Sequence, residues 1–166
     1  MGVKWTTKKN KFPEMERAAA ELNGKRVNVG VSGAGNGYLA SIHEYGCKIK
    51  VTDKMRAYLH SQGLHLKADT EYITIPERAF LRNGFDTSKN SVMKDAEQVL
   101  PSVLDGSLST DEILKMIGII LSSDIKDYAQ QLDSPPLHPF TVKQKGSTNP
   151  LVDTGDMIES ITYEVE

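Results

Sequence analysis

The residues best suited to chemistry in this sequence are two arginines four positions apart, Arg78 and Arg82, which flank the apolar pair Phe80–Leu81. They follow the alternating run Tyr72–Ile75, which is typical of a half-buried strand, and Pro76 ends that strand because proline lacks a ladder N–H. If Pro76 also starts a helical turn, both arginines share one face. Such a corner presents two planar cations beside an apolar anchor, which suits a protein–protein contact. Two solvated arginines at an ordinary strand-to-helix corner are the alternative.

A second chemical pattern is the glycine-rich segment Gly33–Gly37, which lies between the alternating run 25–31 and the apolar stretch Leu39–Tyr45. A glycine-rich turn between a strand and a helix can cradle phosphate, so a nucleotide-binding protein or a small hydrolase is the alternative function. The Gly-x-Gly-x-Gly spacing departs from the dinucleotide fingerprint, and the following helix is too short for a standard crossover. We therefore expect a flexible loop here.

The histidines give little support to a metal site. His43-Glu44 resembles half of a zinc-protease motif, but no second histidine stands four residues after His43. His60 and His65 follow without the cysteine or carboxylate spacing of a zinc centre. No nucleophile can be paired with a base from the remaining residues. We therefore expect no enzyme activity, no catalytic residue, no metal and no cofactor.

Size and composition favour one domain over residues 1–166. A chain of 166 residues with 39% hydrophobic and 25% charged residues can bury one core. The net charge of −2 offers no broad basic field for nucleic acid, and the lysines near the start predict a solvated N-terminus. No apolar run is long enough for a membrane span or a signal peptide. The single Cys47 cannot form an internal disulfide, which fits a reducing compartment or a chain that uses no disulfides.

Periodicity predicts short elements in the first half of the chain. Apolar residues at spacings of three and four indicate helices, and strict alternation indicates half-buried strands. His43 and Glu44 then stand in the last turn of a short helix. The predicted elements are a helix over Phe12–Leu22, a strand over 25–31, a helix over Leu39–Tyr45, a strand over 47–52 and a helix over 53–62.

Two longer helices are expected in the second half. The caps Asp86–Ser88 open a helix of about four turns, which Pro101 is expected to kink or end. Ser109 and Glu112 form a capping box that opens the longest helix, which runs to about Leu132. The first half of this helix has an extra apolar edge. A second subunit could cover that edge, and so could a well-wrapped core.

The composition changes after the longest helix. Residues 134–150 combine a stiff Pro-rich start with a polar continuation, and we expect a flexible loop or arm there. A capped helical turn follows and runs into a last strand, Ser160–Val165, with Ile161, Tyr163 and Val165 on one face.

Three segments, Leu39–Gly46, Ile75–Arg82 and Asn149–Ile161, carry the motifs His-Glu-Tyr-Gly, Ile-Pro-Glu-Arg-Ala-Phe-Leu-Arg and Asp-Thr-Gly. In this order they resemble the tail-completion and neck proteins of long-tailed bacteriophages and prophages. That family has a similar helix end, a similar Ile-Pro-x-Arg-x-Phe-Leu-Arg corner and an Asp-Thr-Gly turn before its final strand. Ala79 departs from the pattern, because the family often has proline there, and residues 87–132 carry no signature.

The resemblance implies an α+β fold in which a small, mostly antiparallel sheet packs against a long helix, with a Pro-rich arm before the C-terminal strand. It also implies a structural virion protein that forms a ring, commonly a hexamer, at the head–tail junction or the top of the tail. Its partners would be further copies of itself, the head–tail connector, and the tail tube or tail terminator proteins. Phage DNA would pass through the lumen without sequence-specific binding. The protein would be found in the virion, and in the host cytoplasm during assembly, with no membrane partner.

Carried over by residue, the resemblance implies an interface. We expect Arg78→Ala or Arg82→Ala to weaken assembly while the fold stays intact. A toxin–antitoxin or regulatory binding module with a partner unrelated to virions is a further alternative. The implied interface residues are Arg78, Phe80 and Arg82 at the docking corner, His43, Glu44 and Tyr45 packed close to it, and Asp153, Thr154 and Gly155 in the C-terminal turn.

Overall fold

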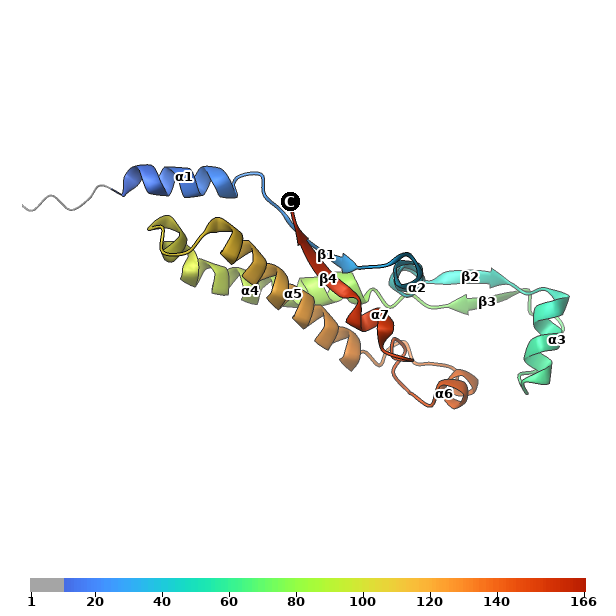
Figure 1. The fold of residues 1–166 in the computed structure, drawn as a ribbon. Coiled ribbons are helices and arrows are strands. Elements are labelled where there is room, and N and C mark those ends of the chain that lie inside the picture. Colours follow the sequence, from blue (N-terminus) through green and yellow to red (C-terminus); the bar gives the residue numbers. More distant parts are fainter. Residues whose placement is uncertain (1–10) are drawn as a thin grey trace, which may run out of the picture.

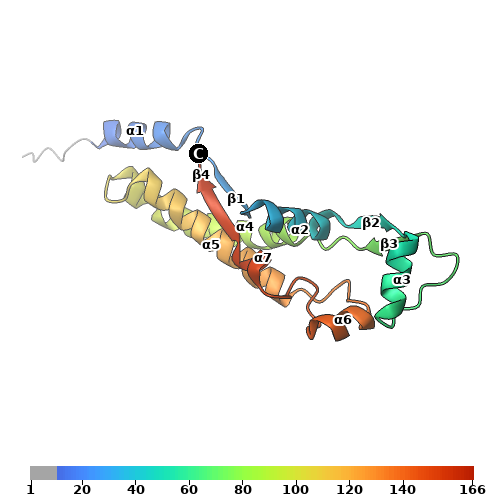
Figure 2. The same cartoon turned by 45° about the vertical axis from the view of Figure 1, so that its right-hand side comes forward.

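The structure, a computed structural model, describes residues 11–166 as a mixture of helices and strands, which confirms the expected α+β class. In chain order the elements are α1 (Phe12–Leu22), β1 (Val27–Val31), α2 (Ala34–Tyr45), β2 (Cys47–Lys50), α3 (Asp53–Ser61), β3 (Tyr72–Ile75), α4 (Phe80–Leu104), α5 (Thr110–Gln131), α6 (Pro139–Lys145), α7 (Asp156–Glu159) and β4 (Ile161–Val165). The molecule is elongated: α1, α4 and α5 occupy one end, and β2, β3 and α3 project as an arm at the other (Figures 1 and 2).

The described strands pair as two separate antiparallel sheets of two strands each, β1 with β4 and β2 with β3. Val29 lies opposite Tyr163 in the first sheet, and Ile49 lies opposite Ile73 in the second. The β1–β4 sheet packs against α5, where Gly118 makes room for the Tyr163 ring, because a Cβ at position 118 would clash with that ring. The expected antiparallel sheet against a long helix is thus confirmed, while β2 and β3 form a ribbon of their own.

The two long helices, α4 and α5, pack side by side. α5 begins with the expected capping box: the Glu112 N–H donates to Ser109 Oγ at 3.2 Å, and the Ser109 N–H donates to the Glu112 carboxylate at 2.8 Å. The extra apolar edge of α5 lies against its own chain, because Ile113 is buried with Ala18 of α1 and Ala96 of α4. At Ile113, therefore, the well-wrapped core is what the structure shows, and a second subunit is not needed to cover it.

The glycine-rich segment is not the flexible loop expected from the sequence. α2 begins at Ala34 rather than at Leu39, so Gly35 and Gly37 lie in its first turn. Gly33 adopts a positive φ of 82° just before the helix, and the Gly37 N–H donates to the Gly33 carbonyl at 2.8 Å. Glycine weakens a helix interior by only about 1 kcal/mol, so packing of the following turns can override its low propensity.

α4 is one helix of 25 residues and not the shorter one expected. It runs through Asp86–Ser88, which the sequence predicts as its cap, and through Pro101, which the sequence predicts as its end. Pro101 is tolerated because it lies in the last turn, where little of the hydrogen-bond ladder remains to be broken. No helical turn begins at Pro76, which was the condition for both arginines to share one helix face, because α4 starts only after Ala79, whose φ of 33° is left-handed.

Residues 134–150 contain α6 and lead from α5 to the C-terminal elements. Asn149 ties the end of this segment to α5, since its Nδ2 donates to the Ala129 and Gln130 carbonyls at 3.3 and 2.7 Å. The flexibility expected for this segment stays a prediction. The helical turn and final strand after it are confirmed as α7 and β4, with Ile161 buried on the core side of β4.

Candidate functional site

The candidate site lies where the end of α2 meets the chain that joins β3 to α4. Gly46 ends α2 with a φ of 70°, and a Cβ there would lie 2.8 Å from both the Ile75 carbonyl oxygen and the Glu77 nitrogen. Next to it, the Arg78 N–H donates to the His43 carbonyl at 2.8 Å. Only glycine tolerates both this conformation and this close approach. The His-Glu-Tyr-Gly motif therefore docks the helix end onto the corner.

Glu44 caps α4 from a distant part of the chain. Its side chain is buried, and its carboxylate accepts the Leu81 N–H at 2.9 Å and the Arg82 N–H at 3.2 Å. The first N–H groups of a helix have no partner within the helix, and the methyl side chain of Ala79 in the N-cap position cannot accept a hydrogen bond. A carboxylate is well suited to this place, because the helix dipole favours negative charge at the N-terminus.

Arg82 lies on the solvent side of the junction between α2 and α4, where it binds Glu44 and Glu77. Its Nε donates to Glu44 Oε1 at 2.8 Å, and its Nη2 donates to the Glu44 carbonyl at 2.9 Å and to Glu77 Oε1 at 2.7 Å. These hydrogen bonds, first the one to Glu44, raise the pKa of Arg82. The guanidinium also lies 5.1 Å from the centre of the exposed Tyr45 ring, within the range of a cation–π contact.

Arg78 lies on the inner side and is only 5% exposed. Its Nε and Nη2 both donate to the Pro135 carbonyl at 3.1 Å, which fixes the segment between α5 and α6 to the corner. Its Nη1 lies 3.4 Å from His43 Nδ1. Burial lowers the pKa of Arg78, but an arginine remains charged in proteins. Arg78 is thus a buried internal tie and not the solvated side chain that one alternative assumed.

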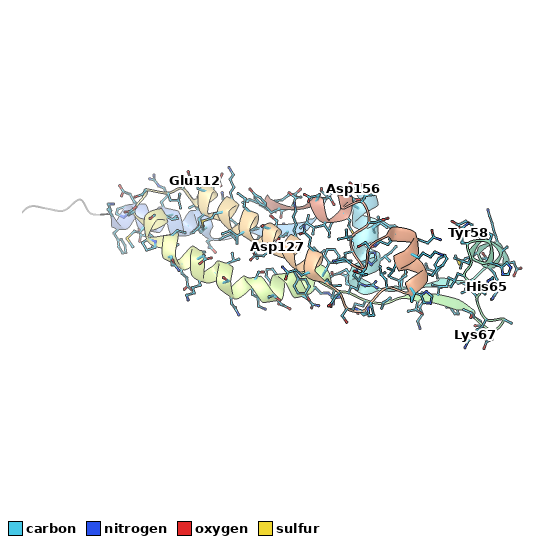
Figure 3. The ribbon with its side chains drawn as sticks, turned by 90° about the horizontal axis from the view of Figure 1, so that it is seen from below. Tyr58, His65, Lys67, Glu112, Asp127 and Asp156 are labelled. Carbon is cyan, nitrogen blue, oxygen red and sulfur yellow. The ribbon has the colours of Figure 1, made fainter. Side chains whose placement is uncertain are left out.

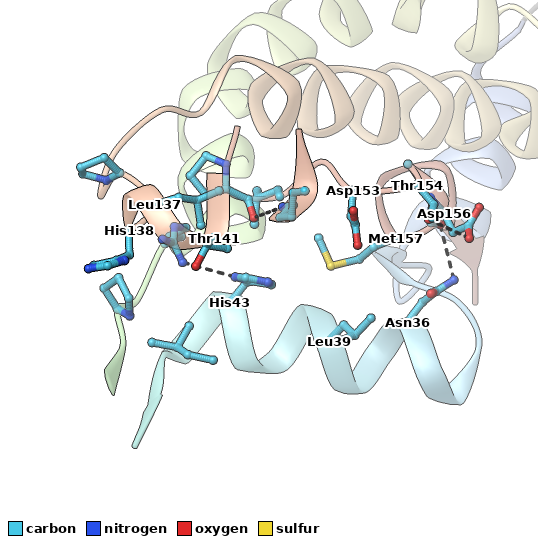
Figure 4. Close-up of a pocket in the computed structure, with 18 of the residues that line it drawn as sticks. Asn36, Leu39, His43, Leu137, His138, Thr141, Asp153, Thr154, Asp156 and Met157 are labelled. Atoms are coloured by element: carbon cyan, nitrogen blue, oxygen red, sulfur yellow. Dashed lines mark hydrogen bonds between the residues drawn. The ribbon is translucent and has the colours of Figure 1, made fainter. Parts of the chain in front are cut away.

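A pocket of about 650 Å³ opens beside Arg78, between α2, α6 and the turn before α7. Figure 4 shows Leu39 and His43 of α2 directed toward Thr141, Asp153 and Met157 on the opposite wall. Apolar side chains and prolines form much of the remaining lining, and they include Ile75, Pro76, Pro136, Leu137, Pro150 and Leu151.

Burial lowers the pKa values of two basic side chains that line the pocket, His43 and Lys145. The pKa of His43 falls from 6.5 to about 4, first because of burial and then because of the positive charges of Arg78 and Lys145. A neutral imidazole can accept a hydrogen bond from Arg78 through Nδ1. Burial also lowers the pKa of Lys145, whose Nζ donates to the Asn149 and Pro150 carbonyls at 3.4 and 3.3 Å.

The structure brings the expected interface residues together in two groups. His43, Arg78, Asp153, Thr154 and Gly155 all line the pocket. The other expected residues are Glu44 and Arg82 in the capping junction, Tyr45 beside it, and Phe80, which is 0% exposed in the main core. Contact of these residues with a neighbouring subunit stays a prediction, and for Phe80 the observed surroundings are those of its own chain.

Three partners at this site escaped the sequence analysis. The Pro135 carbonyl fixes Arg78, the Glu77 carboxylate fixes Arg82, and Lys145 faces the pocket. Glu77 stands next to Arg78 in the motif, so the charge of the motif itself could have suggested a partner. A backbone carbonyl has no signal in the sequence. Lys145 is one of several polar residues in segment 134–150, and nothing in the sequence distinguishes it from the others.

The described residues offer few groups for catalysis or metal binding. Within residues 11–166, no cluster of three or more His, Cys, Asp and Glu side chains could hold a metal ion, although His60 Nδ1 and His65 Nδ1 lie 2.7 Å apart. In the same part of the chain β1 pairs only with β4, so the glycine turn does not belong to a parallel strand–helix–strand unit. None of the helices described is long and apolar enough to cross a bilayer.

Comparison with known proteins gives no relative for this chain, because no family model, no curated protein and no solved structure matches it.

Proposed function

We propose that this chain is a structural virion protein of a long-tailed phage or prophage. Copies of it form a ring, commonly of six, at the head–tail junction or at the top of the tail. The ring completes the tail so that the head–tail connector can attach, and phage DNA passes through the lumen without sequence-specific contacts. Further copies, the connector, and the tail tube or tail terminator proteins are its partners.

The observation that carries this proposal is the exposure of large apolar side chains on several of the elements between α1 and α5. Aromatic residues are enriched where proteins contact each other, so their exposure on many elements suits a subunit with several neighbours. Tyr58 stands with His65 and Lys67 at the far end of the arm (Figure 3). The exposed side chains include Tyr38 and Tyr45 on α2, Tyr58 on α3, Tyr72 on β3, Phe85 and Met93 on α4, and Ile119 on α5.

The arrangement of the three motif segments adds support. Leu39 and His43 come from the first segment, Pro76 and Arg78 from the second, and Asp153 from the third, and all of them line one pocket. Segments that are far apart in the sequence thus meet at one junction. This is the arrangement expected if the three motifs act as a unit.

Light scattering of the purified chain over a range of concentrations, together with averaged electron micrographs, tests the proposal. We expect a ring-sized mass and ring-shaped particles, and we expect mass spectrometry to find the chain in purified tails of the phage that encodes it. A strict monomer that is also missing from purified tails would contradict the proposal. A tight host partner recovered without virion proteins would favour the regulatory binding module instead.

A further inference from the structure

Within residues 11–166, the β1–β4 sheet leaves one edge of each strand without a partner strand. Arg26 and Glu166 exchange both backbone hydrogen bonds, at 2.8 and 2.9 Å, and the register then pairs Asn28 with Glu164. Bonded and non-bonded pairs alternate in an antiparallel ladder. The backbone groups of Val27 and Val29 in β1 therefore point away from β4. By the same alternation, the outward backbone groups of β4 are those of Ile161, Tyr163 and Val165.

Both edges are accessible within the described part of the chain. Among residues 11–166, no hydrogen bond reaches the outward backbone groups of Val27, Val29, Tyr163 or Val165. Beside β1 lies a hollow of about 320 Å³, lined by Leu81, Phe85 and Leu121 among others, and beside β4 lies one of about 620 Å³, lined in part by Asp111 and Lys115. Neither strand contains proline, and the five-residue register is unbroken, so two protections common on edge strands, a proline and a β-bulge, are missing from both strands.

We propose that β4 of one copy pairs antiparallel with the open edge of β1 in the next copy. The two edges differ, so this contact is head-to-tail, and it closes into a ring when the rotation between copies allows. The inference deepens the proposed function, because it supplies the contact that such a ring needs, but it can hold without a role in the virion.

Charge favours a second copy as the occupant of the β1 edge. β1 is preceded by Arg26 and by Lys25, which pairs with Asp111 of its own chain at 2.7 Å, whereas β4 carries Glu164 and is followed by Glu166. Antiparallel pairing between copies places the acidic end of one strand beside the basic start of the other. Opposite charges across neighbouring strands stabilise the pairing. The sheet inside each copy already uses this alignment, since Arg26 and Glu166 lie opposite each other there.

Disulfide trapping between two different chains tests this contact. One chain carries Asn28→Cys and the other Glu164→Cys, both in a Cys47→Ser background, so neither chain can form an internal disulfide. In the register expected between copies, positions 28 and 164 form a non-hydrogen-bonded pair, whose Cα atoms lie about 4.5 Å apart. That separation is within the range of a disulfide. The matched control pairs the Asn28→Cys chain with a chain carrying Asp95→Cys on the exposed face of α4.

We expect the 28–164 disulfide to form at least about tenfold faster than the 28–95 disulfide, because paired strands hold their cysteines at high effective concentration. Equal rates would overturn the inference. A ring in purified tails without the 28–164 disulfide would also overturn it, while the proposed function would stand. Efficient trapping by a chain that is missing from tails would remove the proposed function and leave the strand pairing in place.

A backbone variant gives an independent readout. Val29→Pro removes an outward N–H that the β1–β4 ladder does not use, and proline is accepted on an edge strand whose N–H faces away. Val29→Ala loses similar packing but keeps the N–H. Sedimentation velocity should show association for Val29→Ala and a monomer of 18.3 kDa for Val29→Pro. Equal association of the two variants would overturn the inference, and if Val29→Pro fails to fold, the disulfide rates decide.

Discussion

We expect Glu44→Ala to lower the free energy of unfolding by about 2–4 kcal/mol, because two partly buried backbone N–H groups lose their acceptor. Glu44 is 3% exposed, and its carboxylate accepts the Leu81 N–H at 2.9 Å, the Arg82 N–H at 3.2 Å and Arg82 Nε at 2.8 Å. Alanine removes these acceptors together. The first turn of α4 then has no replacement, because Ala79 in the N-cap position makes no side-chain hydrogen bond.

The magnitude follows from the groups that lose their partner. A buried N–H left without an acceptor costs about 1–3 kcal/mol, and the two backbone N–H groups that Glu44 serves are partly buried, so each contributes toward the lower end of that range. The lost ion pair adds little, because the Arg82 side chain is 51% exposed and water replaces much of the interaction. Glu44→Gln keeps one acceptor oxygen but loses the charge, so we expect about half of the effect of alanine.

Urea unfolding followed by circular dichroism measures these changes, with a constant m-value as the sign that the unfolding transition stays comparable. Glu77→Ala is the matched control. Glu77 accepts a hydrogen bond from the same arginine, Arg82, at 2.7 Å, but its side chain is 56% exposed. We expect this control to cost less than about 1 kcal/mol, which is typical of an exposed ion pair.

Equal losses for Glu44→Ala and Glu77→Ala would refute the assignment of Glu44 as the cap of α4. Should Glu44→Ala fail to fold at all, the comparison between Glu44→Gln and Glu77→Ala carries the test. Loss of stability in Glu44→Gln as large as that expected for alanine would show that the charge, and not the acceptor oxygen, is what the helix end requires.

Three further predictions concern the same junction. His43 stays neutral in the folded chain down to its pKa of about 4, whereas the unfolded chain binds a proton near 6.5. Lowering the pH from 6.5 to 4 should therefore lower the unfolding free energy by about 2 kcal/mol, which is less than the full shift implies because His43 is only partly buried, and His43→Gln should flatten this part of a pH series of urea unfolding curves. Arg78→Ala should speed hydrogen exchange around Pro135, because that carbonyl loses both donors; unchanged exchange would contradict this tie. Ala79→Gly should be neutral or slightly stabilising, because Ala79 has a φ of 33°, whereas Ala96→Gly within α4 should cost about 1 kcal/mol, as measured by thermal unfolding.

Elements with a local signal were predictable from the sequence. The helix over Phe12–Leu22 has the expected bounds, and Ser109 and Glu112 form the expected capping box. β3 ends at Ile75, as the following Pro76 requires. In each of these cases the deciding residues lie within a few positions of the boundary, so the physics that sets the boundary is contained in a short stretch of sequence.

Boundaries that depend on distant partners were not predictable. α4 starts at Phe80 because Glu44, from another helix, supplies the cap that its own sequence lacks. The glycine-rich segment joins α2 against its propensity, and Asn36 in that first turn donates to the Asp156 carbonyl at 3.4 Å. The hydrogen bonds from Arg78 to the Pro135 carbonyl join two distant segments and use a backbone acceptor. No residue type in the sequence therefore predicts them.

The same junction changes the expected effect of Arg78→Ala. β2 begins directly after Gly46 and β3 ends at Ile75, so both strands of the arm leave from the corner that Glu44 and Arg78 hold together. The direction of the arm relative to α4 and α5 is therefore set at this corner. We now expect Arg78→Ala to cost stability, because it removes a buried tie. Any loss of assembly should then arise from a misdirected arm, and a variant that shortens the arm while leaving the corner intact should lose assembly without losing stability.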